Sequence, residues 1–334
     1  MNILDSVGNT PLVELRRVVP EQSARVLVKL EWANPTGSMK DRMAKAVIEG
    51  AERKGLLPPG GTVVEYTAGT TGVSLAFVCA AKGYRLHVAF SDAFSEEKRR
   101  AMLAFGAQIT DVPSDNGRIN EKLIKAMIET SRGIAQQAKH WWADQLNNHD
   151  AIAGYHPLGE EIWQQSGGAV DAFVHMVGTA HSIHGASETL RTHKPIRVVA
   201  VEPAESAVLS GNPSGSHKIE GTGIGFIPPL WQPEAVDGIV AVPTDEAQAM
   251  ARRLAREEGI FAGTSSGANV VAALRVAAHL GRKATVVTLI VDSGLRYLST
   301  GLYASPRPSA AHAEPMHLSD ASATSLAQPP GFSA

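Results

Sequence analysis

One stretch decides how this 334-residue chain is interpreted: Asn34-Pro35-Thr36-Gly37-Ser38-Met39-Lys40-Asp41-Arg42. Ser38 and Asp41 have the spacing of a capping box, which predicts that a helix begins here with a lysine in its first turn. The positive end of the helix dipole disfavours a charged lysine and so favours the neutral amine, the form that makes a Schiff base. Lys40 is therefore a candidate for covalent chemistry, with an ordinary surface lysine as the alternative.

Short apolar runs alternate with helical stretches on both sides of this segment. The runs are rich in Val and Ile and are continuous, which is typical of parallel strands covered on both faces. Buried strands are predicted at residues 63–66, 86–90, 109–112, 172–177, 198–201, 239–242 and 285–291. The pattern predicts an α/β fold of two domains, each a mostly parallel twisted sheet covered by helices. In such folds ligands bind where strand ends lead into loops.

Composition narrows the class of protein. The length is that of about two domains, and 44% hydrophobic with 19% charged residues is typical of a globular chain. A net charge of -2 gives no general reason to bind nucleic acid or a membrane surface. No apolar run approaches the roughly 20 residues of a membrane span, and no leader sequence is visible, so we expect a cytoplasmic protein. The single cysteine, Cys79, lies in an apolar run and is expected to be a core thiol.

Two further loops join a predicted strand to a predicted helix. The first is Thr67-Ala68-Gly69-Thr70-Thr71-Gly72, and the second is Gly178-Thr179-Ala180-His181-Ser182. Small residues let backbone N–H groups approach an anion, so the first suits a carboxylate and the second a phosphate. An ordinary strand-to-helix turn is the alternative for each. The second lacks the Gly-Lys-Ser/Thr ending of a nucleotide-binding loop, and no nearby carboxylate or cysteine completes a zinc site with His175, His181 and His184.

A last loop, Asp292-Ser293-Gly294-Leu295-Arg296-Tyr297, follows the final predicted strand. A hydroxyl at the end of a strand can donate a hydrogen bond to a ring nitrogen, and it can equally cap the next helix. Beyond it the composition changes to Pro, Ser, Ala and His without periodicity, so residues 306–334 are predicted to be a disordered tail.

In order and spacing these loops resemble the cysteine synthase and cystathionine β-synthase family of fold-type II enzymes that use pyridoxal 5′-phosphate (PLP). The resemblance also covers Gly8-Asn9-Thr10-Pro11-Leu12, Gly159-Glu160-Glu161-Ile162-Trp163, Gly263-Thr264-Ser265-Ser266-Gly267 and Tyr297-Leu298-Ser299-Thr300. It implies a PLP cofactor and β-replacement on an O-activated serine, such as O-acetylserine, by a small nucleophile such as sulfide. The product would be cysteine, formed through an aminoacrylate.

The resemblance also implies the division of the chain and the site residues. Residues 1–36 and 147–305 would form the larger, PLP-binding domain, and residues 37–146 a smaller mobile domain. Lys40 would be the Schiff-base lysine and the general base. The 67–72 loop and Gln145 would bind the substrate carboxylate, and Thr70 would also contact the cofactor. Ser293 would hydrogen-bond the pyridine nitrogen, with Asp292 as an alternative neighbour. The phosphate would be held by the remaining loop, Gly178, Thr179, Ala180, His181 and Ser182.

Two departures from the family pattern affect the substrate. The family's carboxylate loop reads Thr-Ser-Gly-Asn-Thr-Gly, where this chain has Ala68 and Thr70, and its phosphate loop reads Gly-Thr-Gly-Gly-Thr, where this chain has Ala180 and His181. A negative φ would accommodate Ala180, and we expect the charge of His181 to supplement phosphate binding.

Several functions are compatible with these departures. The first is a cysteine synthase-like transferase acting on a small amino acid, and the family leads us to expect a homodimer. The alternatives are a β-eliminating lyase, a synthase of a non-standard β-substituted alanine, and a non-catalytic binding protein. Docking of a serine acetyltransferase cannot be read from the sequence.

Overall fold

The computed structural model describes residues 1–117 and 119–304. The described chain up to Tyr303 forms one compact unit. The predicted disordered tail at residues 306–334 lies outside the described residues.

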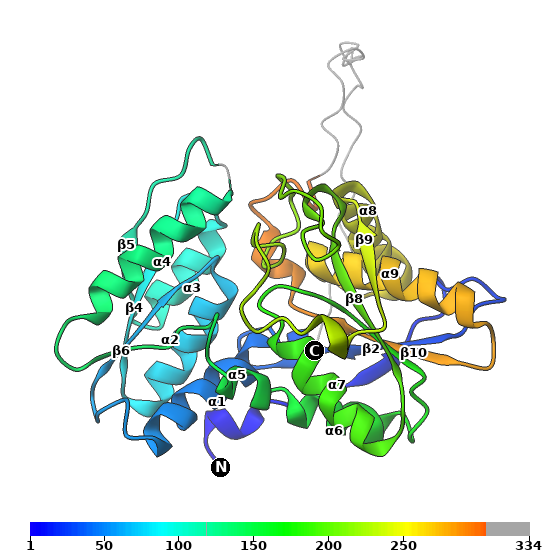
Figure 1. Ribbon diagram of the computed structural model, residues 1–334, viewed down its shortest axis with the longest axis horizontal. Coiled ribbons are helices and arrows are strands. Elements are labelled where there is room, and N and C mark those ends of the chain that lie inside the picture. The colour runs from blue at the N-terminus through cyan, green and yellow to red at the C-terminus, as the bar shows by residue number, and fades with distance from the viewer. Residues whose placement is uncertain (118, 305–334) are drawn as a thin grey trace, which may run out of the picture. The chain divides into compact units, whose positions relative to one another are not determined.

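Two sheets organise this unit (Figure 1). The larger has six strands in the order β1-β2-β10-β7-β8-β9. Its strands are β1 (Leu12–Glu14), β2 (Arg25–Leu30), β7 (Ala172–Met176), β8 (Arg197–Pro203), β9 (Gly238–Val242) and β10 (Thr285–Ile290). Only the β1–β2 pair in it is antiparallel. The four-stranded sheet is parallel throughout, in the order β5-β4-β3-β6. Its strands are β3 (Thr62–Tyr66), β4 (Arg85–Phe90), β5 (Gln108–Asp111) and β6 (His140–Trp142).

Helices pack against both sheets. Helices α2 and α4 contact the four-stranded sheet, whereas α7 and α9 contact the six-stranded sheet. The helices are α1 (Lys40–Arg53), α2 (Thr70–Lys82), α3 (Glu96–Ala104), α4 (Glu121–Ala135), α5 (Asp150–Ala153), α6 (His156–Gln165), α7 (His181–His193), α8 (Thr244–Arg253) and α9 (Thr264–Leu280). Short turns include η2 (Glu31–Ala33) and η6 (Gly294–Tyr297). In the described part of the chain, no helix is long and apolar enough to cross a bilayer.

The α/β class with mostly parallel sheets is confirmed, and all seven predicted strands are present within two residues of their predicted ends. Strands β1, β2 and β6 were missed. β1 and β6 have three residues each, too few to form a pattern. In β2 the apolar run is broken by Lys29, which is nevertheless fully buried because its Nζ pairs with Glu161 at 2.7 Å. The strands of the four-stranded sheet all lie between residues 62 and 142, but the domain boundaries and the mobility of the smaller domain stay predictions.

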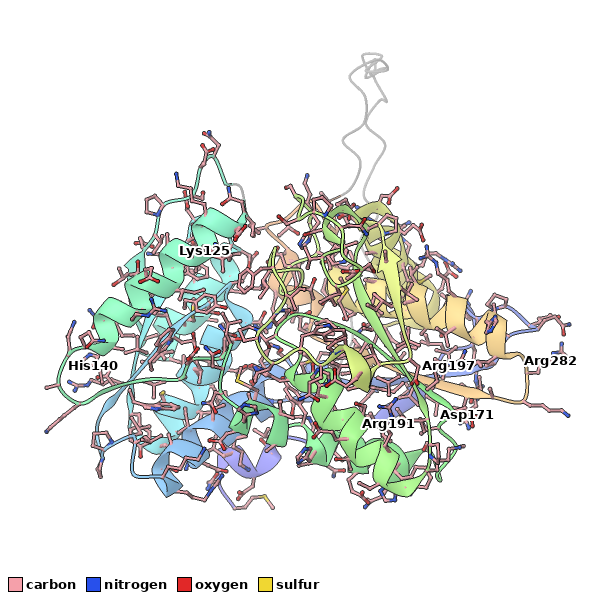
Figure 2. The ribbon with its side chains drawn as sticks, viewed as in Figure 1. Lys125, His140, Asp171, Arg191, Arg197 and Arg282 are labelled. Atoms are coloured by element: carbon pink, nitrogen blue, oxygen red, sulfur yellow. The ribbon has the colours of Figure 1, made fainter. Side chains whose placement is uncertain are left out.

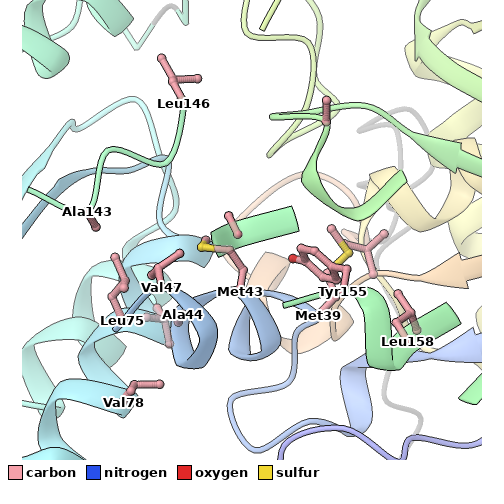
Figure 3. Close-up of a cluster of buried hydrophobic side chains, with 14 of the residues drawn as sticks. Met39, Met43, Ala44, Val47, Leu75, Val78, Ala143, Leu146, Tyr155 and Leu158 are labelled. Carbon is pink, nitrogen blue, oxygen red and sulfur yellow. The ribbon is translucent and has the colours of Figure 1, made fainter. Parts of the chain in front are cut away.

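Helix α1, which carries Lys40, is held on both its apolar and its charged side. Figure 3 shows Met43, Ala44 and Val47 of α1 facing Leu75 and Val78 of α2, all of them buried. Charged side chains such as Lys125 and Arg282 instead point to the outside (Figure 2).

The charged side of α1 is anchored through Arg42. Its guanidinium pairs with Glu31 and with Glu161, each at 2.7 Å, where Arg42 and Glu31 are almost completely buried. Removing one partner of such a buried pair is strongly destabilising, because a charge is left without compensation. These pairs fix the start of α1 relative to the six-stranded sheet.

The predicted capping box at the start of α1 is not formed. The hydroxyl of Ser38 accepts a hydrogen bond from the Lys40 backbone at 3.2 Å, but Asp41 does not reach back to it. Instead the Asp41 carboxylate accepts from the backbone and the hydroxyl of Thr36, at 2.8 and 2.6 Å. Asp41 therefore closes the loop that precedes α1.

Candidate active site

Two adjacent cavities are lined by loops that follow the carboxyl ends of β3, β7 and β10. The α7 cavity, named after the helix that begins at its wall, is lined there by Gly178, Thr179 and Ser182. The α2 cavity is lined at the start of α2 by Thr67, Ala68, Thr70 and Thr71. Both cavities include Lys40, Thr70, Thr179, Glu220, Gly221 and Thr222 in their walls. The strand ends are where the sequence predicted a ligand to bind.

Lys40 lines both cavities from the first turn of α1. Burial lowers the pKa of its amine to about 8, although the nearby negative charge of Asp292 acts to raise it. A larger fraction of the amine is therefore neutral at physiological pH than in a solvated lysine. The neutral amine is the nucleophilic form.

The β7–α7 turn leaves backbone N–H groups available beside the α7 cavity. Ala180 precedes α7 with φ 69°, and no side chain caps the helix, so the first N–H groups of α7 lack a side-chain acceptor. The negative φ that would accommodate Ala180 is not adopted, because the chain reverses from β7 into α7 through the left-handed region. Gly178 has no room for a side chain, since a Cβ would lie 2.6 Å from the Gly221 carbonyl oxygen. The turn has the features of an anion-binding site.

Neither Ala180 nor His181 lines the cavities. His181 is buried, and its Nδ1 lies 2.9 Å from the Thr179 hydroxyl. Burial, followed by the positive charge of Lys40, lowers the pKa of His181 to about 3. The imidazole is therefore neutral, in place of the expected charge.

His175 at the end of β7 is also buried and lines the α7 cavity, with its Nε2 2.8 Å from the Ser182 hydroxyl. Burial and the charge of Lys40 lower its pKa to about 3 as well. His184 contacts a different partner, the backbone N–H of Gln232. Within residues 1–117 and 119–304, no group of three or more His, Cys, Asp or Glu side chains could hold a metal ion.

The β3–α2 turn lines the α2 cavity with Thr67, Ala68, Thr70 and Thr71. Gly69 does not line the cavity and has a φ of 114°. The Thr67 hydroxyl accepts from the backbone N–H groups of Gly69 and Gly72, at 2.8 and 3.0 Å. Thr70 is half-exposed and lines both cavities. The turn that the sequence identified is therefore brought next to Lys40.

Gln145 lines the same cavity and is held by three hydrogen bonds. Its side-chain oxygen accepts from Thr71 at 3.0 Å, and its side-chain nitrogen donates to the Tyr66 carbonyl at 2.8 Å. Its backbone N–H donates to Glu65 at 2.9 Å. Glu65 is completely buried, and burial raises the pKa of its carboxyl to about 8. No sequence pattern pointed to Glu65, because a single charge within an apolar run carries no spacing signal.

Ser293 lies outside both cavities. Its hydroxyl accepts from the Leu295 backbone at 3.3 Å and so caps η6, which was the alternative interpretation. The preceding residue, Asp292, lines the α7 cavity instead, and so does Ser265 at the start of α9. Asp292 is buried, with Oδ2 accepting from Tyr297 at 2.7 Å and Oδ1 without a partner among the described residues. Ser265 belongs to the Gly263–Gly267 motif. The position of this motif at the start of a helix was the sequence signal that could have pointed to Ser265.

Lys98 and Glu220 form a buried ion pair that the sequence did not reveal. The Nζ of Lys98, on α3, lies 2.5 Å from the Glu220 carboxylate, which lines both cavities. The same Nζ lies 4.7 Å from the ring centroid of Tyr297. The pair connects α3 to the part of the cavity wall that contains Glu220.

Comparison with known proteins identifies the family. The family described as "Pyridoxal-phosphate dependent enzyme" matches residues 3–292. A cysteine synthase from Staphylococcus aureus is 44% identical over 306 residues, covering 90% of this chain and 96% of that protein. A solved cysteine synthase structure from Entamoeba histolytica superimposes with a TM-score of 0.85 at 38% identity, covering 92% of each chain.

A third relative is an O-acetylserine-dependent cystathionine β-synthase from Helicobacter pylori. Its structure superimposes with a TM-score of 0.84 at 33% identity, covering 91% of this chain and 98% of that one. The similarity in sequence and in fold spans both sheets and both cavities. This chain belongs to the cysteine synthase and cystathionine β-synthase family of fold-type II, pyridoxal-phosphate-dependent enzymes.

Proposed function

We propose that this enzyme uses PLP to replace the β-substituent of an O-activated serine, such as O-acetylserine, with a small nucleophile such as sulfide, giving cysteine. The observation that carries the proposal is the position of Lys40. It lines both cavities, between the uncapped start of α7 and the turn that precedes α2. Its lowered pKa suits an amine that must react with a carbonyl group.

The residues of the α7 cavity fit the cofactor. A phosphate needs several donors, and the free N–H groups of α7 with the hydroxyls of Thr179 and Ser182 offer them. Gly178 lets this turn pack closely against Gly221, whose carbonyl oxygen would lie 2.6 Å from a Cβ. When bound, PLP supplies an electron sink that stabilises negative charge on the substrate α-carbon. Lys40 is proposed to hold the cofactor covalently and to take the α-proton with its Nζ.

The turn before α2 is proposed to bind the substrate carboxylate. Thr70 brings a hydroxyl to the cavity wall, and the side-chain nitrogen of Gln145 has a second hydrogen beyond the one donated to Tyr66. The Thr71 hydroxyl donates to the Gln145 side-chain oxygen and so helps to orient that amide. Glu65 keeps the Gln145 backbone in place. These groups would orient the substrate so that its α-proton faces Lys40.

For the ring nitrogen we propose Ser265 in place of Ser293. Ser265 is buried and lines the α7 cavity with Lys40, whereas Ser293 lines neither cavity. A neutral hydroxyl does not stabilise a protonated ring, so the cofactor stays a mild electron sink and departure of the β-substituent competes well.

Thr70 favours one alternative. It lines both cavities where the family carries an asparagine, so the fit of the substrate differs there. The alternative function is a lyase that eliminates the β-substituent, or a synthase that uses another nucleophile. A homodimer, expected from the family, and a cytoplasmic location, expected from the sequence, stay predictions.

A visible spectrum of the purified enzyme, recorded before and after O-acetylserine is added, tests the proposal. We expect a yellow protein whose absorption band shifts on addition, with cysteine as the product once sulfide is present. Pyruvate and ammonia in place of cysteine would identify the lyase. A colourless protein that cannot be reconstituted with PLP would contradict both.

The pKa of Lys40 gives a second test. The rate at which the cofactor-free enzyme takes up PLP should rise with pH up to about 8 and then level off, because the neutral amine reacts. A rate that is flat between pH 6 and pH 9 would contradict the role of this amine.

A further inference from the structure

We propose that His175 and His181 are positioning residues that commit the hydroxyls of Ser182 and Thr179 to donate hydrogen bonds into the α7 cavity. This inference rests on the proposed function in one respect, the phosphate as the anion that these hydroxyls meet. It concerns two histidines that do not themselves need to touch the ligand.

The hydrogen on His175 is located by its neighbour Asn269. The side-chain oxygen of Asn269 accepts from the Met176 backbone N–H at 2.6 Å, so its side-chain nitrogen must face the other way. That nitrogen donates to the Leu289 carbonyl at 2.9 Å and to Nδ1 of His175 at 3.2 Å. Because Nδ1 accepts, the hydrogen of a neutral His175 lies on Nε2.

The hydrogen on His175 in turn directs the hydroxyl of Ser182. Nε2–H of His175 donates to the Ser182 oxygen across 2.8 Å. The hydroxyl hydrogen of Ser182 cannot point back at that N–H and is free to point elsewhere. Since Ser182 lines the α7 cavity, its hydroxyl is available to an acceptor there.

His181 repeats the arrangement for Thr179. Its Nδ1 lies 2.9 Å from the Thr179 hydroxyl, and its Nε2 is buried without a partner among the described residues. The Gln145 backbone lies near the ring and acts to raise its pKa, but it makes no hydrogen bond of normal geometry with Nε2, so we assign the hydrogen to Nδ1, where the Thr179 oxygen can accept it. Nδ1–H then donates to Thr179, whose own hydrogen is left for the cavity.

The two imidazoles therefore act while neutral. Charging His175 would put an N–H against the Asn269 amide, where no acceptor is present. Both rings are almost fully buried. An anion in the α7 cavity would then meet two hydroxyl donors oriented in advance, together with the N–H groups of α7, and little reorganisation would accompany binding.

NMR of ¹⁵N-histidine-labelled enzyme, with and without PLP, tests the hydrogen positions directly. We expect His175 as the Nε2–H tautomer and His181 as the Nδ1–H tautomer, both neutral at pH 7 and in both samples. A charged ring, an Nδ1–H His175, or an Nε2–H His181 directed at the nearby Gln145 backbone would overturn the inference for that residue. This result does not depend on whether the enzyme makes cysteine.

Paired variants test the consequence. His175→Phe and His181→Leu remove the donor, whereas His175→Gln and His181→Asn keep an amide N–H at Nε2 and Nδ1 respectively. The dissociation constant of PLP should rise about tenfold in each donor-free variant and stay within about threefold in its amide partner. The ³¹P chemical shift of bound PLP should move only in the donor-free variants.

Two controls separate positioning from general damage. Binding of pyridoxal, which lacks the phosphate, should be unchanged in His175→Phe, since the Ser182 hydroxyl has no phosphate to meet. In a Ser182→Ala background, His175→Phe should add little further loss, because both changes remove the same donor. Equal loss for PLP and pyridoxal, or fully additive losses, would overturn the inference. An enzyme that binds neither would contradict the proposed function and leave the NMR result as the test of the tautomers.

Discussion

The two strand-to-helix turns that line the cavities share a backbone plan and use it differently. Each enters its helix through a residue with positive φ, Gly69 at 114° and Ala180 at 69°. In the β3–α2 turn the Thr67 hydroxyl accepts from two backbone N–H groups of the turn itself. In the β7–α7 turn no side chain caps the helix. The first turn thus satisfies part of its own backbone, whereas the second leaves its N–H groups without a side-chain acceptor among the described residues, which supports the proposal that the two turns bind different ligands.

Replacing Gly69 with alanine should have the largest effect on the difference between the two turns, a loss of about 3 kcal/mol in the free energy of unfolding. An added Cβ would lie 2.4 Å from Cδ of Lys98, whose buried ion pair with Glu220 would have to move. Urea denaturation measures the loss. Gly83→Ala is the control, because Gly83 also has a positive φ (78°) but has open space around it. Equal losses would show that backbone strain alone accounts for the effect.

Ala180→Val should have the next largest effect, a loss of about 2 kcal/mol in the free energy of unfolding. A β-branched side chain is strained at φ 69°, and Ala180 is buried, so no space opens outward. PLP binding should weaken along with stability because the start of α7 shifts. Thermal and urea unfolding, with a PLP titration, would check both effects, and unchanged stability would mean that this turn relaxes freely.

Thr67→Val should lower the free energy of unfolding by about 1.5 kcal/mol, since the N–H groups of Gly69 and Gly72 lose their acceptor. Thr67→Ser keeps the hydroxyl and should recover most of the stability. Hydrogen exchange at these two amides should quicken in the valine variant only. Similar behaviour of both variants would mean that the methyl group of Thr67, and not its hydroxyl, holds the turn.

Ala180→Gly should have the smallest effect and the opposite sign. Glycine tolerates a positive φ without penalty, and its greater freedom in the unfolded chain offsets part of that gain, leaving about 0.5 kcal/mol of stabilisation. Unfolding midpoints of the two proteins, measured side by side, would detect it. A destabilised glycine variant would indicate that the methyl group of Ala180, which is 2% exposed, contributes more by packing than it costs by strain.

The sequence singled out candidate residues where a turn lies next to a strand, and it could not place side chains whose direction depends on distant contacts. Lys40, the 67–72 turn and Gln145 were such candidates, and the structure brings them to one cavity, while their roles stay predictions. Ser293 and Asp292 are neighbours in the chain, yet Asp292 lines the α7 cavity and Ser293 does not, and the Ser293 oxygen accepts from the Leu295 backbone instead. Ser265 was part of a quoted motif, but its direction depends on where α9 packs.

By itself the sequence determined the α/β class, the parallel strands and the family, because these follow from local apolar runs and from short motifs read in order, and it made Lys40 the candidate for covalent chemistry. Only the tertiary structure decided that Lys29 is buried, that Ala180 has a positive φ, and that His175 and His181 are neutral. The reversal from β7 into α7 sets the φ of Ala180. Burial and the partners Glu161, Asn269 and Lys40 set the properties of the other three residues. These partners lie far away in the chain, and the cost of burying a charge or a polar hydrogen depends on what surrounds it in space.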